Sequence, residues 1–249
     1  MKKLGLASIG AAFQRAYERA VGRMHLIVAN SENVRGRIQR FLGRDSIVVY
    51  PPCDTEGFAF AEPQGYYLST ARLVALKRVD RIIDAFRALP GKQLVVASGG
   101  DDAEALRRRA AEAPNIRFVG WTGERELRSL VAGAVATIYV PKDEDFGMSP
   151  VESMAAGKPV IGVAEGGLLE TVLDGETGLL LPAGFTAEDI AAAVDWLTAP
   201  RALSMRRACE ARAAQFTRAR FINGMRAAIA SAGGIEVGVA GAGVREGAA

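Results

Sequence analysis

Residues 136–159 of the chain read ATIYVPKDEDFGMSPVESMAAGKP. The first five residues are apolar and rich in β-formers, and a proline follows them, a pattern typical of a short buried strand. Gly147 permits a backbone conformation that a residue with a Cβ resists. Ser149 opens a Ser-Pro-x-Glu run that ends at Glu152 and has the form of a helix start, with the serine as N-cap and the proline at the first helical position. The stretch therefore predicts a strand, an acidic loop (residues 142–147) and a helix N-terminus.

Two carboxylates, Glu144 and Glu152, bracket this region with seven residues between them. In a parallel α/β sheet, ligands bind just outside the carboxyl ends of the strands. The N–H groups of Phe146, Gly147 and Met148 would point at such a ligand, supported by the helix dipole. A structural interpretation stays open at this point, because a capping box also needs a residue like Glu152 and a solvated loop can also carry one like Glu144.

The spacing and its flanks resemble the E-x7-E signature of the retaining glycosyltransferases of family 4, which have the GT-B fold. The flanks that match are residues 145–147 and 149–160. The resemblance implies that Glu152 accepts hydrogen bonds from the ribose of a nucleoside diphosphate sugar. It also implies that Glu144 binds the hexose and stabilises positive charge at the anomeric carbon. The donor-binding set implied in this region is Glu152, Phe146, Gly147, Met148 and Ser149, with the N–H groups of Gly147 and Met148 orienting the sugar and the β-phosphate.

Two cations follow an earlier predicted strand, in the run STARLVALKR at residues 69–78. Arg72 and Lys77 lie at the carboxyl end of that strand, where a guanidinium fork and an ammonium can hold two phosphates. These cations would stabilise the charge left on a departing diphosphate without a metal. A solvated basic loop is the structural alternative. The resemblance favours the catalytic role, because family members carry an Arg and a Lys at this spacing, although Thr70-Ala71 replaces a glycine-containing pair that is common there.

Two further loops carry candidate donor contacts. Trp121 and Thr122 follow another predicted strand, and the resemblance implies that this backbone contacts the nucleotide base; a structural turn with Thr122 as helix cap is the alternative. Gly166 and Gly167 let the backbone approach a ligand closely and resemble a glycine-rich loop beside the sugar site. Glu170 in the same loop is either part of that site or a first-turn acid that favours its own helix dipole.

The composition is that of an ordinary globular protein. The chain has 249 residues, of which 49% are hydrophobic and 24% charged, with a net charge of +3. This charge is too small to imply nucleic acid, and no basic run is interleaved with aromatic residues. The single His25 and two distant cysteines form no ligand cluster, so we expect no metal, no cofactor and a reducing cytoplasmic compartment. No apolar segment reaches the length of about 20 residues that spans a bilayer, and the N-terminus does not resemble a signal peptide.

The order of patterns predicts the architecture. From residue 66 onward, nearly all-apolar strands alternate with amphipathic helices, which is typical of a parallel sheet covered on both faces. The predicted strands are 66–70, 93–98, 116–119, 136–140, 159–163 and 178–181. The predicted helices are 78–88, 103–113, 124–133, 150–156, 168–172, 187–197, 201–214 and 218–232. Two helices, 11–24 and 31–42, and two short strands, 26–29 and 47–50, precede them. Ser98-Gly99-Gly100-Asp101 is interpreted as a plain strand-to-helix turn.

These elements predict a fold class and a domain division. We expect an α/β protein with a Rossmann-like, doubly wound parallel sheet at residues 66–232, which would be the donor-binding half of a GT-B fold. Residues 1–65 would form a linker or partial N-terminal element, and 233–249 a disordered tail. An ordinary GT-B enzyme has a second Rossmann-like domain, which supplies the acceptor site, and the segment before residue 66 is too short to be one.

The resemblance covers residues 12–232 and implies a retaining hexosyltransferase that acts on a glycan or lipid-linked acceptor. Tyr50-Pro51-Pro52-Cys53-Asp54-Thr55 is most similar to bacterial mannosyltransferases of surface polysaccharide synthesis, so GDP-mannose is the first-choice donor and a UDP-sugar the second. The alternative function is a nucleotide-sugar-binding module or noncatalytic subunit that lacks its N-terminal half. A related epimerase or phosphorylase is a third function, but the sequence offers no motif for it. Contact with the inner membrane through residues 13–23 is the alternative to an interdomain role for that helix.

Overall fold

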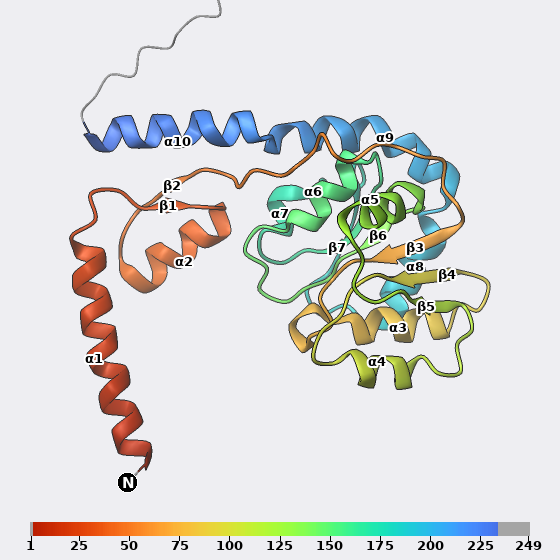
Figure 1. Ribbon diagram of the computed structural model, residues 1–249, viewed down its shortest axis with the longest axis horizontal. Coiled ribbons are helices and arrows are strands. Elements are labelled where there is room, and N and C mark those ends of the chain that lie inside the picture. The colour runs from red at the N-terminus through yellow and green to blue at the C-terminus, as the bar shows by residue number, and fades with distance from the viewer. Residues whose placement is uncertain (1, 234–249) are drawn as a thin grey trace, which may run out of the picture.

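A computed structural model describes residues 2–233 of the chain, with side chains from residue 9 onward. Its centre is a six-stranded parallel sheet (Figure 1). The strands are β3 (Tyr66–Ser69), β4 (Gln93–Val96), β5 (Ile116–Phe118), β6 (Thr137–Ile138), β7 (Val160–Val163) and β8 (Gly178–Leu181). They lie in the order β5-β4-β3-β6-β7-β8. The order reverses between β3 and β6, and ligands of doubly wound sheets bind in the crevice at such a switch point.

Helices cover both faces of this sheet. Figure 1 shows α3 and α4 on one side and α5, α6 and α7 on the other. The helices after β3 are α3 (Val79–Arg87), α4 (Ala103–Arg109), α5 (Glu124–Gly133), α6 (Met148–Ala155), α7 (Leu168–Thr171), α8 (Ala187–Trp196), α9 (Ala199–Ala213) and α10 (Arg218–Gly233). Short 3₁₀ turns lie at Ala75–Lys77 and Ala214–Phe216. The predicted fold class is therefore confirmed, and each predicted helix and strand of the sheet domain is present, with ends that differ by a few residues.

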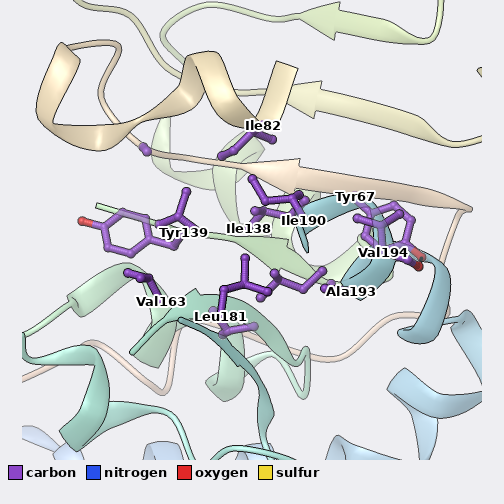
Figure 2. Packing of buried hydrophobic residues seen from close by; sticks show 14 of the residues in the cluster. Tyr67, Ile82, Ile138, Tyr139, Val163, Leu181, Ile190, Ala193 and Val194 are labelled. Atoms are coloured by element: carbon purple, nitrogen blue, oxygen red, sulfur yellow. Dashed lines mark hydrogen bonds between the residues drawn. The ribbon is translucent and has the colours of Figure 1, made fainter. Parts of the chain in front are cut away.

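The strands are apolar on both faces because each face is buried. Successive residues of β3 face opposite ways: Tyr67 packs in the larger cluster with α3 and α8, and Leu68 packs in the smaller cluster with α5. Figure 2 shows the larger cluster, with Tyr67, Ile82 from α3 and Val194 from α8 gathered around the sheet. Burial on both sides explains why these strands read as continuous apolar runs rather than as alternating ones.

The N-terminal segment forms a small unit beside the sheet domain. It contains α1 (Lys2–Gly22), β1 (Val28–Ala29), α2 (Glu32–Leu42) and β2 (Ile47–Val48), and the two strands pair in parallel. Ser31 is the N-cap of α2, as predicted, and its side chain accepts a hydrogen bond from the N–H of Val34. The C-terminal helix α10 returns to this unit, where Gly224 leaves room for Val49. The division at residue 65 stays a prediction, and the tail at 234–249 lies outside the described residues.

One predicted boundary is wrong at a place that matters for the site. Helix α6 begins at Met148 with Gly147 as its N-cap, not at Pro150 with Ser149 as the cap. Gly147 has a φ of 92°, a left-handed conformation that turns the chain into the helix before the serine is reached. The proline is then the third helical residue, which is tolerated because N–H groups in the first turn need no helical partner. Glu152 consequently lies inside the helix and not in a capping box.

Candidate active site

Two of the predicted catalytic residues meet at the switch point. Lys77 follows β3 in the last residue of a 3₁₀ turn, and Glu144 follows β6 in the acidic loop. The Lys77 ammonium lies 2.5 Å from Glu144 Oε2, and the two residues are 67 positions apart in the sequence. Their side chains are 25% and 17% exposed, so the pair is partly shielded but reachable from solvent. The switch point therefore brings a cation and an acid into direct contact.

The hydroxyl of Tyr139 completes this contact. It accepts a hydrogen bond from Lys77 Nζ at 2.9 Å and donates one to Glu144 Oε2 at 2.7 Å. Tyr139 is only 7% exposed, and burial together with the negative charge of Glu144 raises the pKa of its hydroxyl, which therefore keeps its proton. The sequence analysis did not identify this residue. Its one signal was a tyrosine near the carboxyl end of the predicted strand 136–140.

Arg78 is a second residue that the sequence analysis did not single out. Its guanidinium donates to the carbonyls of Val140, at 2.7 Å, and Pro141, and it forms an ion pair with Glu165. The same group lies 4.8 Å from the ring centroid of Phe185. The Arg78 backbone adopts a φ of 52°, an uncommon conformation for a residue with a side chain. Arg78 thus ties the loop after β3 to the loops after β6 and β7, next to the Lys77–Glu144 pair.

Glu152 lies on α6, away from the direct contact between Lys77 and Glu144. Burial raises the pKa of its carboxyl, and the nearby charge of Asp54 raises it further, while Arg128 opposes the shift. Its negative charge also contributes to the raised pKa of the Tyr139 hydroxyl. Among the described residues, the Glu152 carboxylate accepts no hydrogen bond. A half-buried acid without a protein donor is suited to accept hydrogen bonds from a ligand.

The residues between the two glutamates include both buried and solvent-exposed side chains. Phe146 is buried and packs its ring 5.5 Å from Tyr50 and 5.3 Å from Phe216, so only its backbone could reach a ligand. Met148 is exposed and Ser149 is half-buried at the start of α6. Within residues 2–233, the N–H groups of residues 146–149 donate no hydrogen bond to the protein. They are therefore free donors at a helix N-terminus, which favours negative charge.

The glycine pair after β7 has a close neighbour that the sequence did not reveal. A Cβ on Gly166 would lie 2.4 Å from the carbonyl oxygen of Glu144, and one on Gly167 would lie 2.3 Å from the Cα of Phe146. The Gly167 N–H also donates to the Glu144 carbonyl at 2.9 Å. The close approach that these glycines permit in this structure is to the acidic loop itself. The two glycines therefore pack against the acidic loop and hold it in place.

Arg72, Trp121 and Thr122 lie at the same edge of the sheet but outside the contact around Glu144. Arg72 is exposed, and its side chain makes no hydrogen bond or ion pair with the described residues. Trp121 is 73% exposed and its indole lies over Gly99, whose Cβ would fall 2.3 Å from the indole nitrogen. The alternative that made Thr122 a helix cap is wrong, because Gly123 is the N-cap of α5.

The carboxylate of Glu170 binds groups within the protein instead of the sugar that the resemblance implied. Its two carboxylate oxygens accept hydrogen bonds from the N–H groups of Glu32, at 2.7 Å, and Asn33, at 2.8 Å. Asn33 and Ser31 in turn donate to carbonyls of the acidic loop, at 3.1 and 2.6 Å. The start of α2 is therefore attached to the loop that carries Glu144, and Glu170 acts as an anion at a helix N-terminus.

Two general features of the described residues bear on the type of site. No group of three or more His, Cys, Asp or Glu side chains in residues 2–233 is arranged to hold a metal ion. No helix in that range has the length and apolar character needed to cross a bilayer.

Comparison with known proteins identifies the family. The sequence model of the family described as glycosyl transferases group 1 matches residues 54–216. The chain belongs to this family. The matched range includes both loops that form the site, the loop after β3 and the acidic loop after β6. The family-level resemblance carried by the two glutamates is thereby confirmed.

This group 1 glycosyltransferase chain is similar to longer curated proteins. It is 47% identical to the alpha-1,3/1,6-mannosyltransferase ALG2 of Dictyostelium discoideum over a match that covers 46% of this chain and 33% of the relative. It is 34% identical to the D-inositol 3-phosphate glycosyltransferase of Mycobacteroides abscessus, over 59% of this chain and 34% of the relative. The chain thus spans about a third of the length of these relatives.

Solved structures support the fold assignment. The Anabaena HepE, crystallised with UDP and glucose, matches with a TM-score of 0.73 at 20% identity, covering 83% of this chain and 63% of that one. TarM matches with a TM-score of 0.74 at 12% identity, covering 86% and 45%. At these identities the likeness concerns the fold, which is the Rossmann-like sheet domain of a GT-B glycosyltransferase with its adjoining N-terminal elements.

Proposed function

We propose that this chain is the donor-binding half of a retaining hexosyltransferase that uses a nucleoside diphosphate sugar. The observation that carries the proposal is the meeting of Lys77 and Glu144 at the switch point of the sheet. A glycosyl transfer from such a donor needs a cation near the diphosphate and an acid near the anomeric carbon. The two groups lie in contact at the place where doubly wound sheets bind nucleotides.

The proposed reaction divides the charges among named residues. The bond between the anomeric carbon and the diphosphate oxygen breaks, and its electron pair stays on the diphosphate. Arg72 and Lys77 stabilise that negative charge, and no metal takes part in this proposal. Glu144 binds hexose hydroxyls and faces the positive charge that develops on the sugar ring. The acceptor hydroxyl then bonds to the same face of the sugar, and its proton passes to the departing diphosphate.

The remaining donor contacts are proposed from the residues that surround the Lys77–Glu144 contact. Glu152 accepts hydrogen bonds from the ribose, because its carboxylate is half-buried and lacks a protein donor among the described residues. The free N–H groups at the start of α6 hold the sugar and the β-phosphate. Trp121, which is exposed above Gly99, offers its ring to the base. Gly166 and Gly167 contribute by holding the acidic loop and its backbone carbonyls in place.

Mannose is the hexose we propose, with GDP-mannose as donor. The support is the named activity of the Dictyostelium relative, which is a mannosyltransferase. The Anabaena structure contains UDP and glucose, so a UDP-sugar is the donor to test against it. The acceptor is a glycan or a lipid-linked glycan, and a GT-B N-terminal half is the partner that would supply the acceptor site. We place the protein in the cytoplasm or at the inner face of the membrane.

A binding module is the second candidate function. The chain spans about a third of the length of the curated relatives it matches. The resemblance to GT-B enzymes implies that the acceptor site is in the other half. A chain that binds the donor without transferring its sugar would still need the cations after β3 and the acid on α6. The two functions therefore differ in turnover and not in nucleotide affinity.

Calorimetry and a hydrolysis assay test the proposal. The chain is titrated with GDP, UDP, GDP-mannose and UDP-glucose, and release of free diphosphate from each sugar donor is followed separately. We expect binding of one nucleotide pair, and we expect the double variant Arg72→Ala/Lys77→Met to weaken it by about 10-fold or more. The matched control is Arg87→Ala/Lys92→Met, which makes the same charge change at the opposite edge of the sheet.

Each outcome has a definite meaning. Equal loss of affinity in both double variants would show a general charge effect and refute the diphosphate site. Binding with slow release of diphosphate, abolished by Glu144→Gln, would support the enzyme. Binding with no release under any condition would support the binding module.

A further inference from the structure

The Lys77–Glu144 contact raises a question that the proposed function leaves unanswered. In the structure the ammonium and the carboxylate neutralise each other at 2.5 Å. The proposed reaction needs them apart, with Lys77 on the diphosphate and Glu144 on the hexose. When the lysine leaves, Glu144 loses a charged partner in a site where its side chain is only 17% exposed. A carboxylate there needs another donor to stay in one orientation.

The hydroxyl of Tyr139 is positioned to be that donor. Both Lys77 and Tyr139 donate to the same oxygen, Glu144 Oε2, at 2.5 and 2.7 Å. The other oxygen, Oε1, has no hydrogen-bond partner among the described residues. Tyr139 also accepts from Lys77 Nζ at 2.9 Å, so the three groups form a closed triangle. If the lysine departs, the bond from the tyrosine to Oε2 is unaffected and Oε1 stays available for a hydroxyl.

The rest of Tyr139 is well held. Tyr139 as a whole is 7% exposed, and its backbone N–H donates to the carbonyl of Ile161 on the neighbouring strand at 2.9 Å. Its ring belongs to the larger buried cluster, where Figure 2 shows it at one end, near Val163. A hydroxyl on a ring fixed by the core is a rigid donor, because the ring has only two torsions and both are set by packing.

We propose that Tyr139 is a positioning residue, whose hydroxyl holds Glu144 in its hexose-binding orientation while Lys77 moves from the carboxylate to the diphosphate. This inference rests on the proposed function and adds a residue to it. Tyr139 touches neither the diphosphate nor the sugar. It acts through Glu144, and its effect is confined to the part of the affinity that the hexose contributes.

The variant Tyr139→Phe isolates the hydroxyl, because the ring that fills the core is retained. The test compares the dissociation constants of GDP and GDP-mannose, and of UDP and UDP-glucose, for the same variant. We expect Tyr139→Phe to change the affinity for the nucleoside diphosphate by no more than about 3-fold, and to weaken the affinity for the matching sugar nucleotide by about 10-fold, as expected for one hydrogen bond to a charged group. The ratio of the two constants is measured without turnover, so it applies to an enzyme and to a binding module.

A double-mutant cycle separates positioning from simple destabilisation. In the Glu144→Ala background, Tyr139→Phe is expected to have no further effect on the ratio, because the carboxylate that the hydroxyl positions has been removed. Tyr67→Phe is the control. It removes another buried hydroxyl, which donates to the carbonyls of Val194 and Leu197 at 2.9 Å on the opposite side of the core, and it should leave the ratio unchanged.

The outcomes distinguish this inference from the function it rests on. If Tyr139→Phe weakens both ligands equally, or leaves both unchanged, the positioning role is refuted and the donor site stands. The same conclusion follows if its effect on the ratio persists in the Glu144→Ala background. If the unmodified chain binds neither pair, the proposed function fails and this inference fails with it.

Discussion

Lys158 is a buried cation in the motif that also contains Glu152, and it gives a prediction with a definite magnitude. The residue is 1% exposed, and its ammonium donates to the carbonyl of Ala61 at 2.6 Å and lies 4.3 Å from the ring centroid of Phe60. Burial lowers the pKa of this ammonium from its ordinary 10.5 to about 8; Glu62 opposes the shift and Arg206 adds to it. Lys158 therefore ties the segment before β3 to the residues just before β7, and this contact requires a buried charge.

The pH dependence follows from the direction of the shift. Between pH 8 and 10.5 the folded chain has released this proton while the unfolded chain still binds it. The free energy of unfolding therefore rises with pH across that window, and below pH 8 the full cost of the buried charge is present. A shift from 10.5 to about 8 corresponds to about 3 kcal/mol in total, of which about 2 kcal/mol falls between pH 7.5 and 10.

The assay is urea unfolding of the wild type and Lys158→Met, followed by circular dichroism at several pH values in that interval. The difference in unfolding free energy, wild type minus variant, should rise by about 2 kcal/mol from pH 7.5 to 10. Contributions from cysteines and tyrosines are common to both proteins and cancel in the difference. Ser153→Ala is the control, because its hydroxyl hydrogen-bonds to the Lys158 carbonyl in the same buried region without titrating. A difference that stays flat within about 0.5 kcal/mol would refute the buried-charge argument.

Three further predictions concern the site. Gly167→Ala should destabilise the protein by about 3 kcal/mol or more, because its Cβ would collide with the backbone of the acidic loop, whereas Gly123→Ala, which meets open space, should change stability by less than about 1 kcal/mol; similar denaturation midpoints would contradict this. Glu152→Gln should become more stable relative to the wild type as the pH rises above about 4.5. Burial raises the pKa of the Glu152 carboxyl in the folded chain, so the unfolded chain releases this proton first and the wild type loses stability. A constant difference in unfolding free energy across pH 4 to 7 would count against that assignment. Trp121→Ala should leave the melting temperature nearly unchanged, since the side chain is 73% exposed, and should weaken nucleotide affinity by about 10-fold in calorimetry; unchanged affinity would remove it from the base site.

The attachment of α2 to the acidic loop links the N-terminal segment to the site. Glu170 accepts from the first N–H groups of α2, and Asn33 donates to the carbonyl of Glu144. Arg37 adds an ion pair with Asp145. The loop that carries the proposed hexose-binding acid is thus held both by α2 and by the glycines after β7. Its conformation depends on contacts from segments on both sides of it in the sequence.

The sequence by itself determined the architecture of the sheet domain. Apolar runs of strand length alternate with helical periods, and these are local patterns that burial on two faces imposes on each segment separately. The same local logic predicted that Arg72, Lys77 and Glu144 follow the carboxyl ends of strands. It failed at the start of α6, because the Ser-Pro-x-Glu run suited a cap at Ser149 while the left-handed Gly147 turned the chain first.

Only the tertiary structure decided which of these groups meet. Lys77 contacts Glu144, 67 residues away in the sequence, because β3 and β6 are neighbours in the sheet. The order of strands in a sheet is not indicated by the local periodicity of the sequence. The donor role of Tyr139 likewise depends on that neighbourhood. The glycines at 166 and 167, interpreted from sequence as room for a ligand, face the acidic loop because two separate chain segments pack against each other there. Contacts between distant segments are set by the packing of the whole core, and a single sequence carries no direct record of them.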